Sequence, residues 1–330
     1  MSFARITLVL LLLSPFFTGC AAPAPTDPSG KLRVVTTVSP ITNIIQNIGG
    51  DRIDVTGIVP EGVNSHTFEP APSDARLLAQ ADIIFVNGLF LEEPTIKLAE
   101  ANKREGVEIV SLGEQTVTPE EYVYDFSFPK EAGNPNPHLW MNPLYAARYA
   151  ELVAESLAAK DPANADFYRA NAAAFAERIA VLDSAIAATL ATIPVEKRRL
   201  LTYHDSFAYF APRYGMTVLG AVQPADFSEP SAQEVARLIT QLRDEKIPAI
   251  FGSEVFSSPI LEQIAKESGA VFIDQLRDDD LPGEPGDANH SYFGLLVEDV
   301  RVITAALGGD VSGLDGIATG NLLSEKTEGK

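Results

Sequence analysis

Three of the four histidines in this 330-residue chain are spread at nearly even intervals along it. His66, His138 and His204 each end, or follow, a stretch whose composition predicts a β-strand or the loop after one. A further step of similar length reaches Asp274, within another β-branched run. Imidazole nitrogens and a carboxylate oxygen are typical ligands of a divalent transition metal. These four residues are therefore candidate metal ligands.

Each candidate histidine also has an explanation that involves no metal. His66 fits an exposed loop residue, and His204 fits a hydrogen-bonded histidine in the core. His138 has the most restricted position, because it lies between a proline and the only tryptophan of the chain. The residue pattern alone leaves a metal site and a set of purely structural histidines about equally open.

Several other side chains compete for the fourth ligand position. Asp205 and Glu254 also stand near the ends of predicted strands. A carboxylate such as Asp274 at a buried strand end needs a partner or a cation. The acidic run 278–280 is predicted to be a solvated loop, and His290, in a segment rich in Asp, Asn and Gly, is predicted to be exposed.

The N-terminus has the pattern of a bacterial lipoprotein signal. One basic residue precedes the apolar run 6–13, and small residues precede Cys20, the only cysteine of the chain. The run is shorter than the roughly 20 residues that span a bilayer. A lone cysteine cannot form an internal disulfide, and lipidation accounts for it better than an ordinary cleaved leader does. We therefore expect a signal peptide over 1–19 and a flexible, Pro-rich tether over 20–31.

The chain is strongly acidic, with a formal net charge of −20. Such a charge argues against nucleic acid as a partner, because phosphate binding needs a basic surface. It suits the attraction of cations, although an acidic surface is also common in secreted proteins. After the leader no apolar run is long enough to span a membrane, so we expect a soluble, monomeric body held at a membrane by lipid on Cys20.

The body alternates β-branched runs with helical stretches. This alternation predicts two Rossmann-like α/β lobes with parallel sheets. We expect an N-terminal lobe over 32–160, a linking helix over 161–194 with Asp161 as its N-cap, a C-terminal lobe over 195–308 and a frayed polar tail over 309–330. Ligands of open parallel sheets bind at the carboxyl ends of the strands, so the four candidates should meet in the cleft between the lobes.

Separated blocks of the body resemble solute-binding protein family 9, the ZnuA/TroA-like zinc- and manganese-binding lipoproteins of bacterial ABC importers. The resemblance covers most of the region from Leu32 to Leu307 and keeps the blocks in the family's order. The blocks are 64–74 with 81–89 and Glu92, then Asn136-Pro137-His138-Leu139-Trp140-Met141-Asn142-Pro143, then 202–207, 229–231 and 270–274.

The resemblance implies two lobes joined by one rigid helix over 162–193. It implies a metal held in the interlobe cleft by His66, His138, His204 and Asp274, and delivered outside the cytoplasm to an ABC permease, with no catalytic activity. The chain departs from the family at Asn64-Ser65, where Asp-Pro is more usual. The segment 113–137 contains no histidine, so an auxiliary loop site, found in many zinc members, is not expected.

Three imidazoles and one carboxylate without a thiolate suit tetrahedral Zn²⁺. Mn²⁺ prefers more oxygen ligands, and manganese members of the family often have Glu where this chain has His204. Zinc is therefore the favoured cargo, with manganese next and iron a further candidate. Two other classes stay open from the residues: a metallohydrolase, and a surface adhesin or binder of another small solute.

Overall fold

The computed structural model describes residues 30–223, 228–253 and 259–323. The described residues from Leu32 onward form one compact unit. The predicted signal peptide, the predicted lipidation site Cys20 and the competing carboxylate Glu254 lie outside the described residues. Among the helices that are described, none is both long enough and apolar enough to cross a bilayer.

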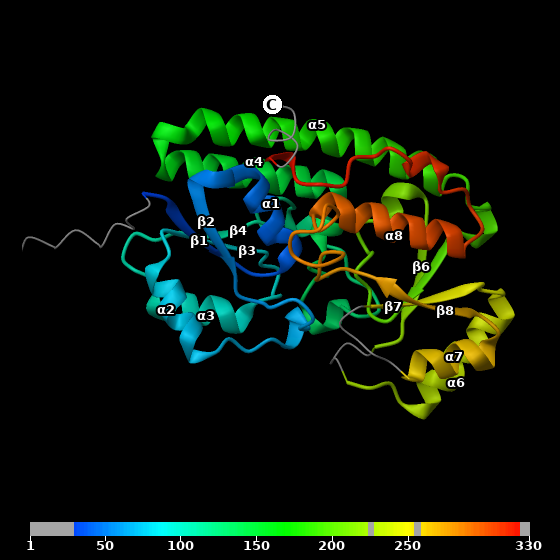
Figure 1. The fold of residues 1–330 in the computed structure, drawn as a ribbon. Helices are drawn as coiled ribbons and strands as arrows, with labels where there is room; N and C mark the ends of the chain where they lie inside the picture. Colours follow the sequence, from blue (N-terminus) through cyan, green and yellow to red (C-terminus); the bar gives the residue numbers. More distant parts are fainter. Residues whose placement is uncertain (1–29, 224–227, 254–258, 324–330) are drawn as a thin grey trace, which may run out of the picture. The chain divides into compact units, whose positions relative to one another are not determined.

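The first lobe is built on a parallel sheet in the order β2-β1-β3-β4. Its strands are short and mainly apolar because both faces of the sheet are covered. One face packs against α1, whereas α2 and α3 cover the other (Figure 1). The elements are β1 (Leu32–Thr36), α1 (Ser39–Gly49), β2 (Ile53–Gly57), α2 (Pro72–Gln80), β3 (Ile83–Val86), α3 (Glu93–Asn102) and β4 (Ile109–Ser111).

The second lobe repeats this topology, with a parallel sheet in the order β6-β5-β7-β8. Helices α6 and α7 cover one face, and α8 packs on the side of the core shared with the first lobe. The prediction of two α/β lobes with parallel sheets is thus confirmed. The elements are β5 (Arg199–Thr202), β6 (Thr217–Ala221), α6 (Ala232–Glu245), β7 (Ala249–Ser253), α7 (Pro259–Ser268), β8 (Val271–Leu276) and α8 (Tyr292–Ala306).

One long helix, α5 (Ala165–Leu190), contacts α1 of the first lobe and α8 of the second. It lies beside α4 (Pro143–Lys160) along the shared core, and Figure 1 shows the two helices running together. Asp161 is the C-cap residue of α4 and also the N-cap residue of a 3₁₀ turn over Pro162–Asn164, and its carboxylate accepts hydrogen bonds from Asn164 Nδ2 (2.6 Å) and the Tyr168 hydroxyl (2.8 Å). This short 3₁₀ turn separates the two helices, so α5 begins later than predicted.

The segment after α8 is packed through residue 323 rather than frayed. Leu314 is 1% exposed, and Leu322 is also buried. The buried amide of Asn47 in α1 holds this segment, because it accepts from Leu322 N (2.8 Å) and donates to Asn321 Oδ1 (2.8 Å). Because this segment is mostly polar, the sequence did not indicate that its two leucines, Leu314 and Leu322, belong to the core beside α1 and α5. Residues 324–330 lie outside the described part of the chain.

Candidate metal centre

Three of the four predicted ligands meet at one point between the lobes. The Nε2 atom of His138 lies 3.1 Å from Nε2 of His66 and 3.2 Å from Nε2 of His204. His66 is in a 3₁₀ turn after β2, His138 precedes the turn that leads into α4, and His204 follows β5. A proton can join only one pair of such nitrogens at a time, whereas a single cation can accept all three lone pairs.

The fourth group at this point is Asp278, which we predicted from the sequence to lie in a solvated loop. Its Oδ2 atom lies 2.8 Å from His204 Nε2 and 3.8 Å from His138 Nε2. The side chain is buried, and its other oxygen accepts a hydrogen bond from Ser253 Oγ (3.2 Å). The main-chain oxygen of Asp278 accepts from the Trp140 indole (2.8 Å), which fixes the backbone as well. The carboxylate that joins the histidines is therefore that of Asp278.

The structure does not bring Asp274 to the histidines. Asp274 lies within β8 with an exposed side chain, whereas His138 and His204 are buried. The strand continues to Leu276, so the loop at its carboxyl end begins after the residue predicted as ligand. Asp278 occupies that loop, where ligands of parallel sheets are expected.

The neighbouring acids of the run are buried because they bind the first lobe. Asp279 Oδ2 accepts from the main-chain nitrogen of Ser65 (3.1 Å), and Asp280 Oδ2 accepts from that of Gly62 (2.7 Å). The prediction that residues 278–280 form a solvated loop is thus wrong, since the loop that carries His66 covers them. These hydrogen bonds connect the His66 loop to the segment that carries Asp278.

Asn136 fixes the orientation of the His138 ring. Its side-chain oxygen lies 2.9 Å from both the main-chain nitrogen and Nδ1 of His138. Its amide nitrogen donates to Asp125 Oδ2 (2.7 Å) and to the main-chain oxygen of Asp205 (2.5 Å). The Asn136 oxygen is thereby identified as an acceptor, so His138 carries its proton on Nδ1 and presents the lone pair of Nε2 to the centre.

The shifted pKa values at this centre keep its side chains in the protonation states that bind a cation. Burial, and then the charge of His204, lowers the pKa of His66 to about 3. Burial likewise holds the pKa of His138 well below its usual value. Burial alone would raise the pKa of Asp278, but the charge and hydrogen bond of His204 outweigh it and lower that pKa. At neutral pH, His66 and His138 therefore carry lone pairs, and Asp278 carries a negative charge.

The remaining candidates lie apart from this centre. Among the described residues, only His66, His138 and His204 form a cluster of three close ligand atoms. Asp205 is buried, and burial together with the charge of Asp125 raises its pKa to about 7. His290 lines a different pocket, where its side chain is 14% exposed.

A small pocket lies beside His66. It has a volume of about 90 Å³, and His66, Phe90 and Phe128 are among its lining residues. His66 is partly exposed, unlike His138 and His204. Of the three histidines, only His66 lines this pocket, so His66 is the one that a cation entering by it would meet first.

Comparisons with known proteins show the family that the chain resembles. The family model for ZnuA, the periplasmic component A of a zinc-uptake complex, matches residues 34–306. The metal ABC transporter substrate-binding lipoprotein FimA of Streptococcus parasanguinis is 31% identical over 300 residues, which cover 88% of this chain and 95% of FimA. The iron-binding protein YfeA of Yersinia pestis is 34% identical over 284 residues, which cover 86% and 89% of the two chains.

Solved structures share the fold. The periplasmic zinc-binding protein TroA of Treponema pallidum superposes with a TM-score of 0.77 at 27% identity, covering 84% of this chain and 99% of TroA. The manganese-bound Y68F mutant of a periplasmic metal-binding protein from Candidatus Liberibacter asiaticus gives a TM-score of 0.72 at 29% identity, covering 84% and 100%. Similarity therefore extends over nearly the whole described body.

Proposed function

The chain belongs to the ZnuA family of periplasmic zinc-uptake components, and from this premise we propose that it captures Zn²⁺ outside the cytoplasm and delivers it to an ABC permease. The family resemblance predicted from the sequence blocks is confirmed. The chain is the substrate-binding component of a metal ABC transporter and not an enzyme. The metallohydrolase considered from the residues alone is therefore set aside.

The proposed ligands are His66, His138, His204 and Asp278. The observation that carries this assignment is the approach of the three Nε2 atoms to one another, at 3.1 and 3.2 Å, with a carboxylate oxygen 2.8 Å from one of them. Ligand atoms around a tetrahedral zinc ion with bonds of about 2.0–2.1 Å are about 3.3–3.4 Å apart. The two separations between nitrogen atoms are close to that value, whereas the 2.8 Å contact has the length of a hydrogen bond between His204 and Asp278 that a bound cation would replace.

Zinc is favoured by the chemistry of the ligand set. Three nitrogen donors and one oxygen donor match a four-coordinate zinc site, whereas manganese prefers oxygen-rich sites of higher coordination number. Manganese is the second candidate, because a relative, PsaA of Streptococcus pneumoniae, is named as a manganese-binding lipoprotein. The iron-binding name of YfeA keeps iron as a further possibility.

The position of the centre supports a capture-and-release mechanism. The first lobe supplies His66 and His138, and the second supplies His204 and Asp278, so neither lobe holds the full ligand set. Separation of the lobes would divide the ligands and weaken binding. Docking on the permease would use this property to release the cation. Hydrogen bonds from the His66 loop to Asp279 and Asp280 would break in the same movement.

The remaining assignments follow the sequence. We propose a signal peptide over 1–19, a tether over 20–31 and a lipid on Cys20 that anchors a monomeric body to a bacterial membrane outside the cytoplasm, at the cell surface or in the periplasm. The lobes and linking helix are assigned to 32–160, 161–194 and 195–308. Residues 309–323 are assigned to the folded body because they pack on α1 and α5.

A metal-uptake experiment tests the proposed function. Protein stripped with a chelator is titrated with Zn²⁺, and Mn²⁺ is then offered in competition. We expect one tightly held zinc ion per chain that manganese at similar concentration does not displace. Tight uptake of manganese but not zinc would overturn the choice of cargo, and no tight uptake of either would overturn the metal-capture function.

A further inference from the structure

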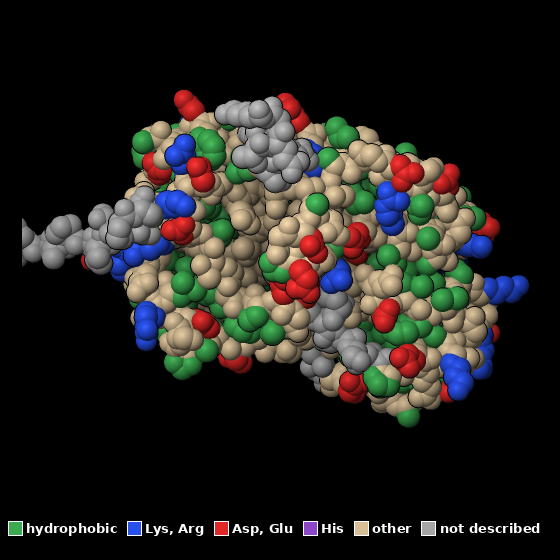
Figure 2. Space-filling model, viewed as in Figure 1, with side chains coloured by type: hydrophobic (Ala, Val, Ile, Leu, Met, Phe, Trp, Pro, Cys, Tyr) green, Lys and Arg blue, Asp and Glu red, His purple; other side chains and the backbone are tan. Residues whose placement is uncertain are grey.

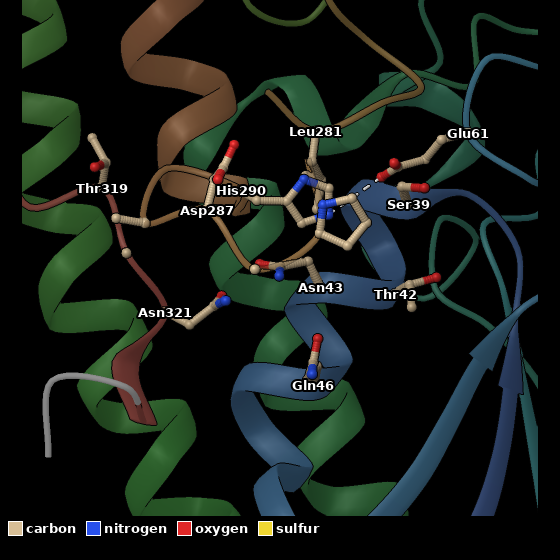
Figure 3. Close-up of a pocket in the computed structure, with 14 residues that line it drawn as sticks. Ser39, Thr42, Asn43, Gln46, Glu61, Leu281, Asp287, His290, Thr319 and Asn321 are labelled. Atoms are coloured by element: carbon tan, nitrogen blue, oxygen red, sulfur yellow. Dashed lines mark ion pairs between the residues drawn. The ribbon is translucent and has the colours of Figure 1, made fainter. Parts of the chain in front are cut away.

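A second and larger pocket lies between α1, the segment 281–290 and the C-terminal segment. Its volume is about 690 Å³. Figure 2 shows a hollow coloured mostly tan, for uncharged polar side chains and backbone, with acidic side chains near its edge. Figure 3 shows Asn43 and Gln46 on α1 and Asn321 on the opposite side of the pocket. The pocket therefore suits water and small polar or cationic solutes.

Two side chains from different lobes face each other at this pocket. His290 Nε2 lies 3.6 Å from Glu61 Oε1 (Figure 3). The other ring nitrogen, Nδ1, lies 3.2 Å from the carbonyl oxygen of Pro282. A carbonyl oxygen only accepts hydrogen bonds, so the proton of neutral His290 resides on Nδ1. The lone pair of Nε2 is then directed toward the carboxylate, as in histidines that bind metals through Nε2.

The separation of 3.6 Å fits a loose ion pair when His290 is protonated, and it also fits two ligands that share one cation. It is too long for a hydrogen bond, which would bring the two atoms to about 2.7–2.9 Å in a charged pair. Two ligands of one cation, each bonded at about 2.0–2.1 Å, lie about 3.3–3.4 Å apart at the tetrahedral angle and farther apart at wider angles. In the candidate metal centre, neighbouring ligand atoms are 2.8 to 3.8 Å apart.

From this geometry we propose that His290 and Glu61 bind a second divalent transition-metal cation, with water completing its coordination. The side chains are 14% and 33% exposed, so a hydrated cation can reach both. The described residues provide no third histidine or carboxylate close enough to complete a cluster there. The second cation is therefore held more weakly than one bound by three imidazoles and a carboxylate.

The second site would connect the same two segments as the main centre. Glu61 directly precedes Gly62, whose main-chain nitrogen donates to Asp280, and His66 lies farther along the same loop. His290 is the last residue of the segment 278–290, which begins with the three consecutive aspartates. A cation between Glu61 and His290 would thus bridge the lobes at a point outside the buried centre and would favour the closed arrangement.

Zinc titration of the stripped protein tests this proposal. We expect two binding steps, with the weaker step reduced at least tenfold in His290→Ala and in Glu61→Gln. Glu284→Gln is the matched control, because Glu284 is an exposed carboxylate of the same segment that does not line the pocket. It should retain both steps. A single step in the unmodified protein, or an unchanged weaker step in His290→Ala, would overturn the second site.

Cadmium-113 NMR detects the second site and the main metal centre independently of each other. The loaded protein should give two signals, of which His290→Ala removes one and His204→Ala the other. Loss of both signals in His290→Ala, with circular dichroism unchanged, would contradict a separate second site. Persistence of both signals in His204→Ala would instead contradict the proposed main centre and leave the His290 result to decide the second site.

Discussion

Asp278 Oδ2 lies 2.8 Å from His204 Nε2, and these two residues are the ligands proposed for the second lobe. Replacement of a ligand carboxylate by an amide removes its negative charge. Loss of a residue that merely orients a ligand weakens metal affinity by up to about 100-fold. Because Asp278 is proposed to bind the metal directly, we expect Asp278→Asn to weaken zinc affinity by at least about 100-fold. Competition with a chromophoric chelator measures this change.

Asp274→Asn is the matched control for that substitution. Asp274 is the exposed aspartate of β8 that the family resemblance identified as ligand. We expect its zinc affinity to stay within about twofold of the unmodified protein, because surface charges at a distance are largely screened. The reverse pattern, with loss of affinity only in Asp274→Asn, would return the ligand role to Asp274.

Asn136 should act on the metal through His138. We expect Asn136→Ala to weaken zinc binding about 10- to 100-fold, as is typical when the partner that orients a ligand histidine is removed. Asn102→Ala, at the end of α3, serves as a control for loss of an amide. Equal affinities in the two alanine variants would exclude a positioning role for Asn136.

The histidines could be predicted from the sequence because strand ends converge in a parallel sheet. His66, His138 and His204 each follow a strand or its loop, as the local pattern predicted, whereas the prediction that they are ligands rested on the family resemblance. Asp278 could not be recognised in this way, because three consecutive aspartates usually favour solvent. Their burial depends on main-chain donors of Gly62 and Ser65, more than 200 residues away in the chain.

The packing of the C-terminal segment was likewise not predictable from the local sequence pattern. Leu314 and Leu322 are separated mostly by polar and small residues, so no helical or strand period marks them as core. The buried Asn47 that holds the segment lies 275 residues before Leu322. Local patterns predict elements well, but contacts between distant segments depend on the assembled fold.

Acid should destabilise the metal-free protein through His66. Its pKa is about 3 in the folded chain, against an ordinary value of 6.5, so the unfolded chain binds an extra proton between these values. The free energy of unfolding should therefore be unaffected by this group above pH 6.5 and should fall as pH decreases toward 3. Urea unfolding at pH 7 and pH 5 measures the difference.

His66→Asn provides the comparison for this pH effect. Asparagine does not titrate, so the variant should lose less stability than the unmodified protein between pH 7 and pH 5. The expected difference is on the order of 1–2 kcal/mol, from about 1.4 kcal/mol for each pH unit below the unfolded pKa. Identical pH dependence in the two proteins would show that His66 does not contribute in this range.

Leu314 should contribute to stability although it lies beyond the last α-helix. The side chain is 1% exposed and belongs to the main hydrophobic core. We expect Leu314→Ala to lower the free energy of unfolding by about 2–4 kcal/mol, the usual effect of removing a buried leucine side chain. Val195→Ala, at a position 74% exposed, should change it by less than about 0.5 kcal/mol. If both substitutions had a similarly small effect, the result would support the original prediction of a frayed tail after α8.

Phe90 should control how fast the cation enters and leaves. Leu89 and Phe90 have positive φ angles of 50° and 68°, an unfavourable conformation for large side chains. Hydrogen bonds hold this turn, since Leu89 N donates to Glu114 Oε1 (2.8 Å) and Gly88 N donates to Glu92 Oε2 (3.0 Å). The result is an aromatic side chain, 52% exposed, at the small pocket that leads to His66.

Removal of that ring should widen the route without changing the ligands. We expect Phe90→Ala to accelerate zinc association and release to a chelator by the same several-fold factor, so that affinity is nearly unchanged. Stopped-flow measurements of both rates test this expectation. Phe126→Ala is the control, because Phe126 is 60% exposed but does not line the pocket. Unchanged rates in Phe90→Ala would mean that zinc passes to the histidines by another route or only when the lobes separate.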